Sequence, residues 1–282
     1  MEYIKKFNQD KSKVTITFTD INYFGWKREH CIKTHTFKVE KKEIIYQKIF
    51  NKEPIDLKGA YLKDFSLSEY TKQYQPDVKT VKINLLSAAC AFFENVDFSM
   101  AKFNEGNIDF SFTTFGSGYA RFYLAKFGDG DVSFNSTRFA KESPYLSMAE
   151  FGKGNISFRG ARFGEGSVHF YMTKFGDGDV SFHGAQFNNG KKDFSFCKFG
   201  HGKLDFMFAD FKDGDVSFMC SEFGKGLKIF SGAEFGEGLI DFSWTKFDLG
   251  DVSFAGTNFR QGYVSFRGIT IKGDWNMQGI EG

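Results

Sequence analysis

The chain has 282 residues, 41% of them apolar, which is enough for one large domain or for a small domain followed by an extended array. It holds 39 Phe and 31 Gly but only 3 Pro, so a few positions must be filled repeatedly by the same residue types. A formal net charge of +2 excludes a strongly charged protein that would need nucleic acid or a membrane surface as its partner.

The first residues, Met1 to Phe7, contain no apolar stretch typical of a secretion signal, and no window approaches the roughly 18 apolar residues of a membrane span. We therefore expect a cytoplasmic protein with no membrane partner. The four cysteines lack CxxC and other metal-type spacings, and we interpret them as small buried thiols: Cys31, Cys90, Cys197 and Cys220.

Residues 1–54 show no repeat, but polar and apolar residues alternate in Lys13–Thr19 and in His35–Val39, which predicts strands. The end of a repeat array exposes unpaired strand edges, so we expect this segment to form a small β-rich cap over it. Leu follows at a spacing of five at positions 57, 62 and 67, and residues 70–86 then interrupt the pattern. We predict a protruding loop or short helix there, and a candidate contact surface.

From about residue 93 to 271 the chain repeats every 12 residues. One series of Phe runs from Phe103 to Phe259 and is continued by Ile271, and a second runs from Phe98 to Phe266 with Leu146 as its one replacement. The residue two before a Phe is nearly always small in the first series and often aliphatic in the second, so two alternate side chains face inward and each unit is a very short strand. Gly recurs between the strands, where we expect turns that need positive φ.

The physical coil is twice as long as the visible repeat. A 12-residue coil would enclose two Phe in a cross-section suited to Ala or Ser, whereas a 24-residue coil has four faces, each contributing one Phe and one smaller side chain. One column also alternates with a period of 24, because Met148 and Met172 occupy it in one half and Gly160 and Gly184 in the other. We predict an all-β, four-sided β-solenoid with about 24 residues per coil.

The five-residue gaps resemble the pentapeptide-repeat family, whose unit is a small residue, a polar residue, a central Leu or Phe and two variable residues. The uninterrupted series at Leu57, Leu62 and Leu67 carries the resemblance most directly, and Phe93, Phe98 and Phe103 resume it. The resemblance implies a right-handed quadrilateral helix over residues 55–275, followed by a tail at 276–282, in a bacterial-type protein. The departure is two extra residues in every second unit, which lengthen two corners per turn.

No recurring set of residues predicts chemistry. The five His are scattered, without a nucleophile and base in register, so we expect neither enzymatic activity nor a cofactor. Gly128-Asp129-Gly130-Asp131 is superficially similar to calcium-binding β-roll repeats, but those need a period of about nine residues, and Lys153 and Lys225 occupy the equivalent of Asp129. We expect no metal site.

The clearest candidate site is an apolar stripe that the 24-residue period gathers onto one edge: Met100, Leu124, Met148, Met172, Phe196, Cys220 and Trp244. Two residues further on, Lys recurs alongside the stripe at Lys102, Lys126, Lys174, Lys198 and Lys246. An apolar strip flanked by Lys suits an amphipathic, acidic-edged segment of a partner. Alternatively, these side chains stack at a corner or are covered by the N-terminal region, and serve stability alone.

A second candidate is the aberrant repeat at residues 139–146, where Glu142 replaces the corner Gly and Pro144 starts the strand. Pro in a stacked strand loses a ladder hydrogen bond. This unit is either a neutral irregularity or a place where Glu142, Tyr145 and Glu150 are displayed to a partner.

We therefore expect a non-enzymatic scaffold that binds a protein partner. The resemblance implies an alternative, a regulator of type II topoisomerase that mimics DNA and confers quinolone resistance. That role needs an acidic column, whereas Asp129 and Asp177 alternate with Lys153 and Lys225. A component of immunity or phage defence is a further alternative. The last coil has no evident cap, so the chain could also form a homodimer through the C-terminal coil, and direct nucleic-acid binding is not expected.

Overall fold

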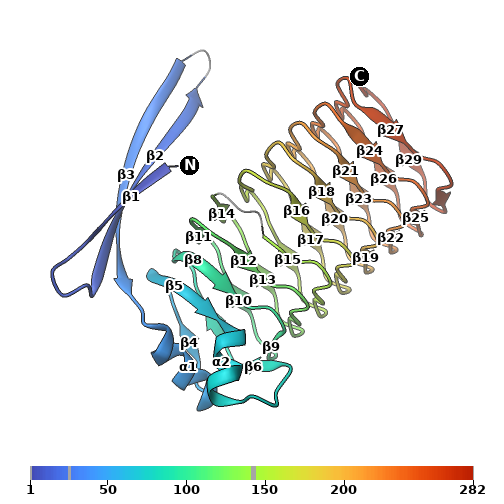
Figure 1. The fold of residues 1–282 in the computed structure, drawn as a ribbon. Coiled ribbons are helices and arrows are strands. Elements are labelled where there is room, and N and C mark those ends of the chain that lie inside the picture. The colour runs from blue at the N-terminus through green and yellow to red at the C-terminus, as the bar shows by residue number, and fades with distance from the viewer. Residues whose placement is uncertain (1, 25–26, 141–143, 282) are drawn as a thin grey trace.

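The computed structural model describes residues 2–24, 27–140 and 144–281. It is an all-β solenoid of parallel stacked coils with two short helices near its N-terminal end (Figure 1). Each coil passes through four faces, and each face is a parallel ladder between successive coils.

The first face is a continuous ladder of ten strands: β4 (Ile55–Asp56), β7 (Leu86–Ser87), β10 (Ile108–Asp109), β13 (Val132–Ser133), β15 (Ile156–Ser157), β17 (Val180–Ser181), β20 (Leu204–Asp205), β23 (Lys228–Ile229), β26 (Val252–Ser253) and β29 (Trp275–Asn276). The second face holds β5 (Ala60–Ser66), β8 (Phe92–Asp97), β11 (Thr114–Phe115) and β14 (Arg138–Phe139). Single bridges continue it from Arg138 through Arg162 to Asn258 and Glu281.

The third face begins in the second halves of β5 and β8 and continues through β12 (Ala120–Arg121), β16 (Val168–His169), β18 (Lys192–Asp193), β21 (Val216–Ser217), β24 (Leu239–Asp241) and β27 (Tyr263–Ser265). The fourth face holds β6 (Val81–Ile83), β9 (Ala101–Phe103), β19 (Lys198–Phe199), β22 (Glu222–Phe223), β25 (Lys246–Phe247) and β28 (Thr270–Ile271). Bridges at Lys126, Glu150 and Lys174 join β9 to β19.

Residues 24 apart lie directly over one another. Val132 pairs with Ile156 and Ile156 with Val180, and the rings of Phe127 and Phe151 stack with centroids 4.4 Å apart and an interplanar angle of 5°. Both Phe series point inward and form one continuous buried core. These contacts confirm the predicted four-sided solenoid with 24 residues per coil.

The corner glycines differ from the expectation on one edge. Gly166 and Gly190 have φ of 134° and 135°, as predicted for turns that favour Gly, but Gly154 and Gly178 show no positive φ. A Cβ on Gly154 would lie 2.2 Å from the carbonyl oxygen of Gly130, one coil earlier. At Gly154 and Gly178, Gly is required by the close stacking of successive corners, not by a left-handed backbone.

The N-terminal segment forms an antiparallel sheet of β1 (Glu2–Phe7), β2 (Lys13–Phe24) and β3 (Lys27–Val39). It joins the solenoid where Lys38–Val39 pairs with Ala60–Tyr61 and packs against the outer surface of the second face. The core at the end of the solenoid is covered instead by helix α1 (Lys42–Phe50), whose buried side chains belong to the same cluster as those of the first coil (Figure 1). The N-terminal segment is β-rich, as expected, but α1 rather than its sheet covers the end of the first coil.

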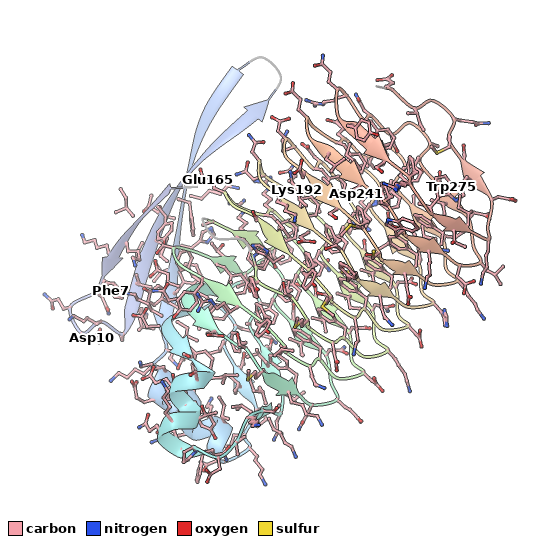
Figure 2. All side chains as sticks on the ribbon, turned by 45° about the vertical axis from the view of Figure 1, so that its right-hand side comes forward. Phe7, Asp10, Glu165, Lys192, Asp241 and Trp275 are labelled. Carbon is pink, nitrogen blue, oxygen red and sulfur yellow. The ribbon has the colours of Figure 1, made fainter. Side chains whose placement is uncertain are left out.

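The predicted insertion at residues 70–86 contains the end of a second helix, α2 (Leu67–Tyr74), and strand β6. At the other end of the molecule, Trp275 lies over the last Phe layer, with its ring 5.2 Å from that of Phe247 and 5.5 Å from that of Phe266 (Figure 2). The ladder extends past residue 275, since the Phe259 amide donates to the carbonyl of Glu281 at 2.7 Å. None of the helices in the described ranges is long and apolar enough to cross a membrane.

Candidate binding surface

The apolar stripe lies along the corner between the third and fourth faces. All seven of its residues have left-handed backbone, with φ between 55° for Leu124 and 60° for Trp244. Trp244 is 55% exposed and Phe196 41%, Met100 and Met172 are similarly exposed, and the other three are half-buried. The stripe is therefore solvent-accessible along the solenoid rather than covered by the N-terminal region.

The side chains of the stripe contact residues of the neighbouring coils. The Tyr123 hydroxyl lies 3.6 Å from the Met148 sulfur, and the rings of Tyr171 and Phe196 meet edge to face at 5.7 Å. The Arg267 guanidinium lies 5.9 Å from the centre of the Trp244 ring. These contacts order the stripe but leave its outer surface exposed.

The backbone at these positions makes large side chains unfavourable. A residue other than Gly in the left-handed region costs roughly 1–2 kcal/mol. In the other half of each coil the equivalent corner is often Gly, as at Gly160 and Gly184, which have φ of 62° and 61°. The large apolar residues of the stripe thus occupy a backbone conformation that Gly adopts without a steric penalty. The conformation of the corner therefore does not explain why apolar residues are found there.

Four of the five lysines beside the stripe form ion pairs with glutamates of the same column. Glu150 accepts from Lys126 at 3.0 Å and from Lys174 at 2.8 Å. Glu222 likewise lies 3.6 Å from Lys198 and 3.1 Å from Lys246. The hydrogen bonds from the lysines hold the pKa of both Glu150 and Glu222 below the ordinary value. From Lys102 to Lys246 this column carries five Lys and two Glu, a net charge of +3.

The aberrant repeat lies beside the stripe. Glu142 falls outside the described residues. Tyr145 is exposed on the third face, with its ring 5.1 Å from that of His169. The ladder continues here, because the Tyr145 amide donates to Ala120 and the Leu146 amide to His169. Glu150 is half-buried and forms ion pairs with Lys126 and Lys174.

The stripe and the insertion, identified separately in the sequence, meet at one groove. A cavity of about 640 Å³ lies between α2 and the first stripe residues, lined by Leu67, Thr71 and Val78 on one side and by Met100 and Leu124 on the other. Its lining is largely apolar, with Lys79 and Lys126 at its border. Sequence patterns could not reveal this contact, since it joins a repeat corner to a segment without repeats.

The acidic corners form a hydrogen-bonded ladder. The side chain of Asp131 accepts from the Asn155 amide at 2.7 Å, that of Asn155 from the Asp179 amide at 2.9 Å, and that of Asp179 from the Lys203 amide at 2.8 Å. Within the described ranges, no three His, Cys, Asp or Glu side chains gather as metal ligands would. The sequence does contain a signal for this ladder, because Asp and Asn replace one another at positions 24 apart. Both side chains carry an oxygen that can accept a hydrogen bond from a backbone amide.

The cysteines differ from the expectation of small buried thiols. Of the three cysteines whose side chains are described, Cys197 alone is buried, and burial raises the pKa of its thiol far above the ordinary value. Cys90 is exposed, and Cys220 is half-buried within the stripe. The side chain of Cys31 lies outside the described residues. None of the three described cysteines is in a disulfide.

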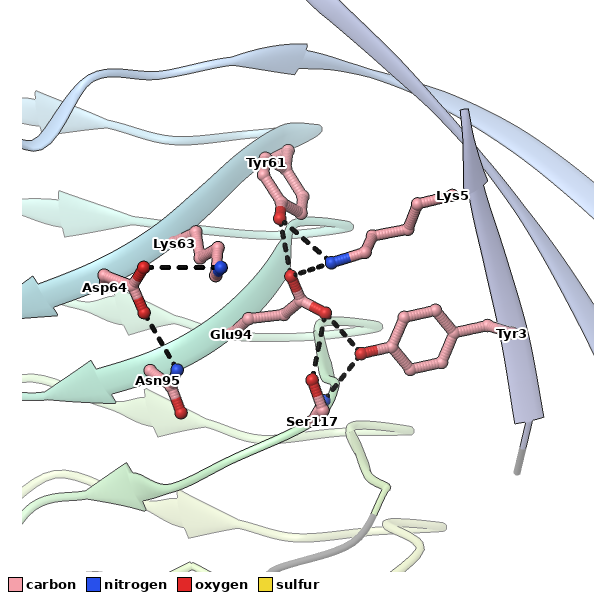
Figure 3. A network of polar contacts seen from close by, with 8 residues as sticks. All are labelled: Tyr3, Lys5, Tyr61, Lys63, Asp64, Glu94, Asn95 and Ser117. Carbon is pink, nitrogen blue, oxygen red and sulfur yellow. Dashed lines mark hydrogen bonds and ion pairs between the residues drawn. The ribbon is translucent and has the colours of Figure 1, made fainter. Parts of the chain in front are cut away.

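A buried carboxylate that sequence reasoning missed attaches the N-terminal sheet to the solenoid (Figure 3). Glu94 is 1% exposed and accepts from Lys5 at 2.6 Å, from the Tyr61 hydroxyl at 2.5 Å and from the hydroxyls of Tyr3 and Ser117. Burial alone would raise the pKa of Glu94, but the hydrogen bonds from Lys5, Tyr3 and Tyr61 outweigh it and lower that pKa. No spacing in the sequence connects these residues.

Comparison of the chain with protein-family models and with curated proteins found no match.

Proposed function

We propose that this chain is a pentapeptide-repeat-like scaffold without catalytic activity, which binds a protein partner along the apolar stripe. The observation that carries the proposal is the row of exposed apolar side chains held in left-handed backbone at one corner of seven successive coils. Six steps of about 4.8 Å make a strip roughly 29 Å long. Exposed apolar surfaces of this continuity are typical of interaction sites.

The neighbouring charges favour a particular kind of partner. The Lys and Glu column beside the stripe has a net charge of +3, and Lys79 stands at the border of the groove beside α2. An amphipathic helix about 20 residues long would span the stripe at 1.5 Å per residue. Its apolar face would contact Met148, Met172 and Phe196, and an acidic edge would face the lysines.

The test compares two corners of the same solenoid. Proteins are captured from the source cells on immobilised wild-type chain, on a variant with Met148→Asp, Met172→Asp and Phe196→Asp, and on a control with Phe208→Asp. Phe208 has the same left-handed backbone and is highly exposed, but lies on the opposite corner. We expect a partner retained by wild type and control and reduced about tenfold or more by the stripe variant, since tenfold corresponds to about 1.4 kcal/mol.

Equal recovery of every captured protein by the folded stripe variant would contradict the proposal. Circular dichroism and melting curves of all three proteins establish that they are equally folded.

We also propose that the C-terminal coil is a contact between two copies of this chain. No helix covers this end in the described part of the chain, and Val264, Phe266 and Ile269 are only partly buried against the core. Tyr263 is 73% exposed, and Ile271 is also exposed. Burying the last coil against a second copy would remove both the apolar surface and the open strand edge from water.

A further inference from the structure

A second surface lies on the opposite side of the solenoid from the stripe, between the N-terminal sheet and the second face. The sheet meets the solenoid at an apolar cluster that includes Phe18, Phe37 and Phe92. Beyond this cluster, β2 and β3 diverge from the coils as a long arm (Figure 1). The space between the arm and the coils is an open cleft of about 530 Å³.

The cleft is lined by basic side chains on both walls. Lys33 and His35 come from the arm, and Arg138 and Arg162 come from the second face. No acidic residue is found among the described residues that line it. Lys33 and Arg162 are exposed, and neither has an ion pair within the described residues.

Two arginines stand on one wall of the cleft. Arg138 and Arg162 are bridge partners in adjacent coils, so their side chains leave the same face one strand spacing apart. Further along this face Arg260 lies 3.2 Å from Glu234, whereas the cleft offers Arg162 no such acidic neighbour among the described residues. The wall that carries Arg162 thus favours an anionic occupant.

The arm also offers backbone groups to that occupant. β3 pairs with β2 along its whole length but with β5 only at Lys38 and Val39. Over residues 33–37, where β3 borders the cleft, no described strand lies on its other side. An open strand edge presents alternating N–H and C=O groups that an extended peptide can pair with.

We propose that this cleft binds an extended acidic peptide, which adds as a strand to the free edge of β3 and places its carboxylates against Lys33 and Arg162. The open edge selects a peptide over a nucleic acid, because only a peptide backbone satisfies a β-strand's donors and acceptors in register. The site is independent of the apolar stripe, with which it shares no residue.

The test uses a fluorescein-labelled heptapeptide of alternating Glu and Val, with binding followed by anisotropy on the full chain. We expect saturable binding that weakens from about 50 mM to about 500 mM salt, because the contacts are partly electrostatic. The variants Lys33→Glu and Arg162→Glu should each weaken binding about tenfold or more, a change of about 1.4 kcal/mol. Lys225→Glu, an equal charge change at an exposed corner outside the cleft, should leave it unchanged.

Two further probes separate the alternatives. A peptide with N-methyl groups on alternate residues cannot donate to β3 in one register, and it should bind about tenfold more weakly or not at all. A single-stranded oligothymidylate of equal charge should bind more weakly than the peptide. The proposal is overturned if the peptide does not bind, if Lys225→Glu weakens binding as much as Arg162→Glu, or if the N-methyl peptide or the oligonucleotide binds equally well.

Discussion

Two lysines occupy core positions where the neighbouring coils carry aliphatic residues. Lys192 lies between Val168 and Val216 in the third face and donates to the carbonyl of Asp213 at 2.7 Å (Figure 2). Lys228 lies in the first face, and its ammonium donates to the carbonyls of Asp248, Leu249 and Gly250. Burial lowers the pKa of both, that of Lys192 to about 8.

The lowered pKa of Lys192 predicts a stability that rises with pH. Below pH 8 both the folded and the unfolded chain carry the proton, and the cost of burying the charge is present in full. Between about pH 8 and the unfolded pKa of about 10.4, the unfolded chain binds more protons, so stability increases. Replacing the residue as in Lys192→Val should raise the free energy of unfolding at pH 7 by about 1–3 kcal/mol and reduce this rise.

Urea unfolding at pH 7 and pH 9.5 measures both effects. Lys191→Val is the control, because Lys191 is the adjacent residue and is exposed. A Lys192→Val variant that is less stable than wild type at pH 7 would show that the hydrogen bond of the ammonium and its packing in the core outweigh the burial cost.

At the scale of the element, the corners combine two different reasons for Gly. Gly154 stacks on Gly130 with no space for a Cβ, whereas Gly184 has φ of +61° and no heavy atom within 4 Å of the place that a Cβ would take. The first constraint comes from contact between coils, and the second comes from the backbone of a single turn. Substitution by Ala separates them.

We expect Gly154→Ala to destabilise the protein by about 2–3 kcal/mol, since two backbones must move apart to admit the methyl group. Gly184→Ala should cost roughly 1 kcal/mol, the penalty of a left-handed residue with a Cβ. Thermal melting of the two variants compares the costs directly. If the two variants were equally destabilised, the stacked corners would move apart at a lower free-energy cost than their close spacing indicates.

The N-terminal sheet is an element attached mainly by one buried carboxylate and an apolar cluster. Glu94 has a lowered pKa, so its contribution to stability is complete above its unfolded pKa of about 4.3 and is lost as pH falls through the folded value. In Glu94→Gln the charge is lost while the size is kept. We expect amide exchange in Glu2–Phe7 to increase about tenfold or more, because losing a buried charged partner costs more than about 1.4 kcal/mol.

Hydrogen exchange with mass spectrometry resolves this effect, since exchange in β15 and β17 should be unaffected. Glu150→Gln, which removes the two ion pairs of a half-buried carboxylate on the fourth face, is the matched control and should leave β1 protected. Unchanged protection of β1 in Glu94→Gln would assign the attachment to the apolar cluster alone.

At the scale of the whole molecule, the two ends of the solenoid are unequal. Helix α1 buries Ile45, Tyr46 and Ile49 against the first coil, whereas Trp275 and Ile280 pack at the last coil and no described helix covers it. Coils in a solenoid contact only their neighbours, so a coil without a helix over it buries less apolar surface. The asymmetry is the physical basis for the proposed contact between two copies.

A dimer formed through the last coil should be sensitive to a charge placed there. We expect light scattering after size exclusion to give a mass near twice the 32.1 kDa of the chain, and Ile271→Asp to return it to that of the monomer. Ile4→Asp, an exposed apolar residue at the opposite end, is the control and should remain dimeric. A monomeric wild-type chain at high micromolar concentration would contradict the proposal.

The repeat by itself determined the solenoid, its 24-residue coil and the edge on which the apolar residues gather. These follow from local and periodic information, because every coil places the same residue types at the same corner, and the volume of four Phe excludes a smaller coil. The stripe residues could be identified for the same reason, since positions 24 apart must stack.

Only the tertiary structure decided how the segments without repeats are attached. The covering of the first coil by α1, the carboxylate of Glu94 beneath Tyr3 and Lys5, and the meeting of α2 with Met100 all join residues whose separation follows no period. Such contacts depend on the shapes and charges of two finished surfaces, which no local pattern encodes. The periodic chain thus specifies its own stacking, whereas its cap, its cleft and its groove exist only once the coils are in place.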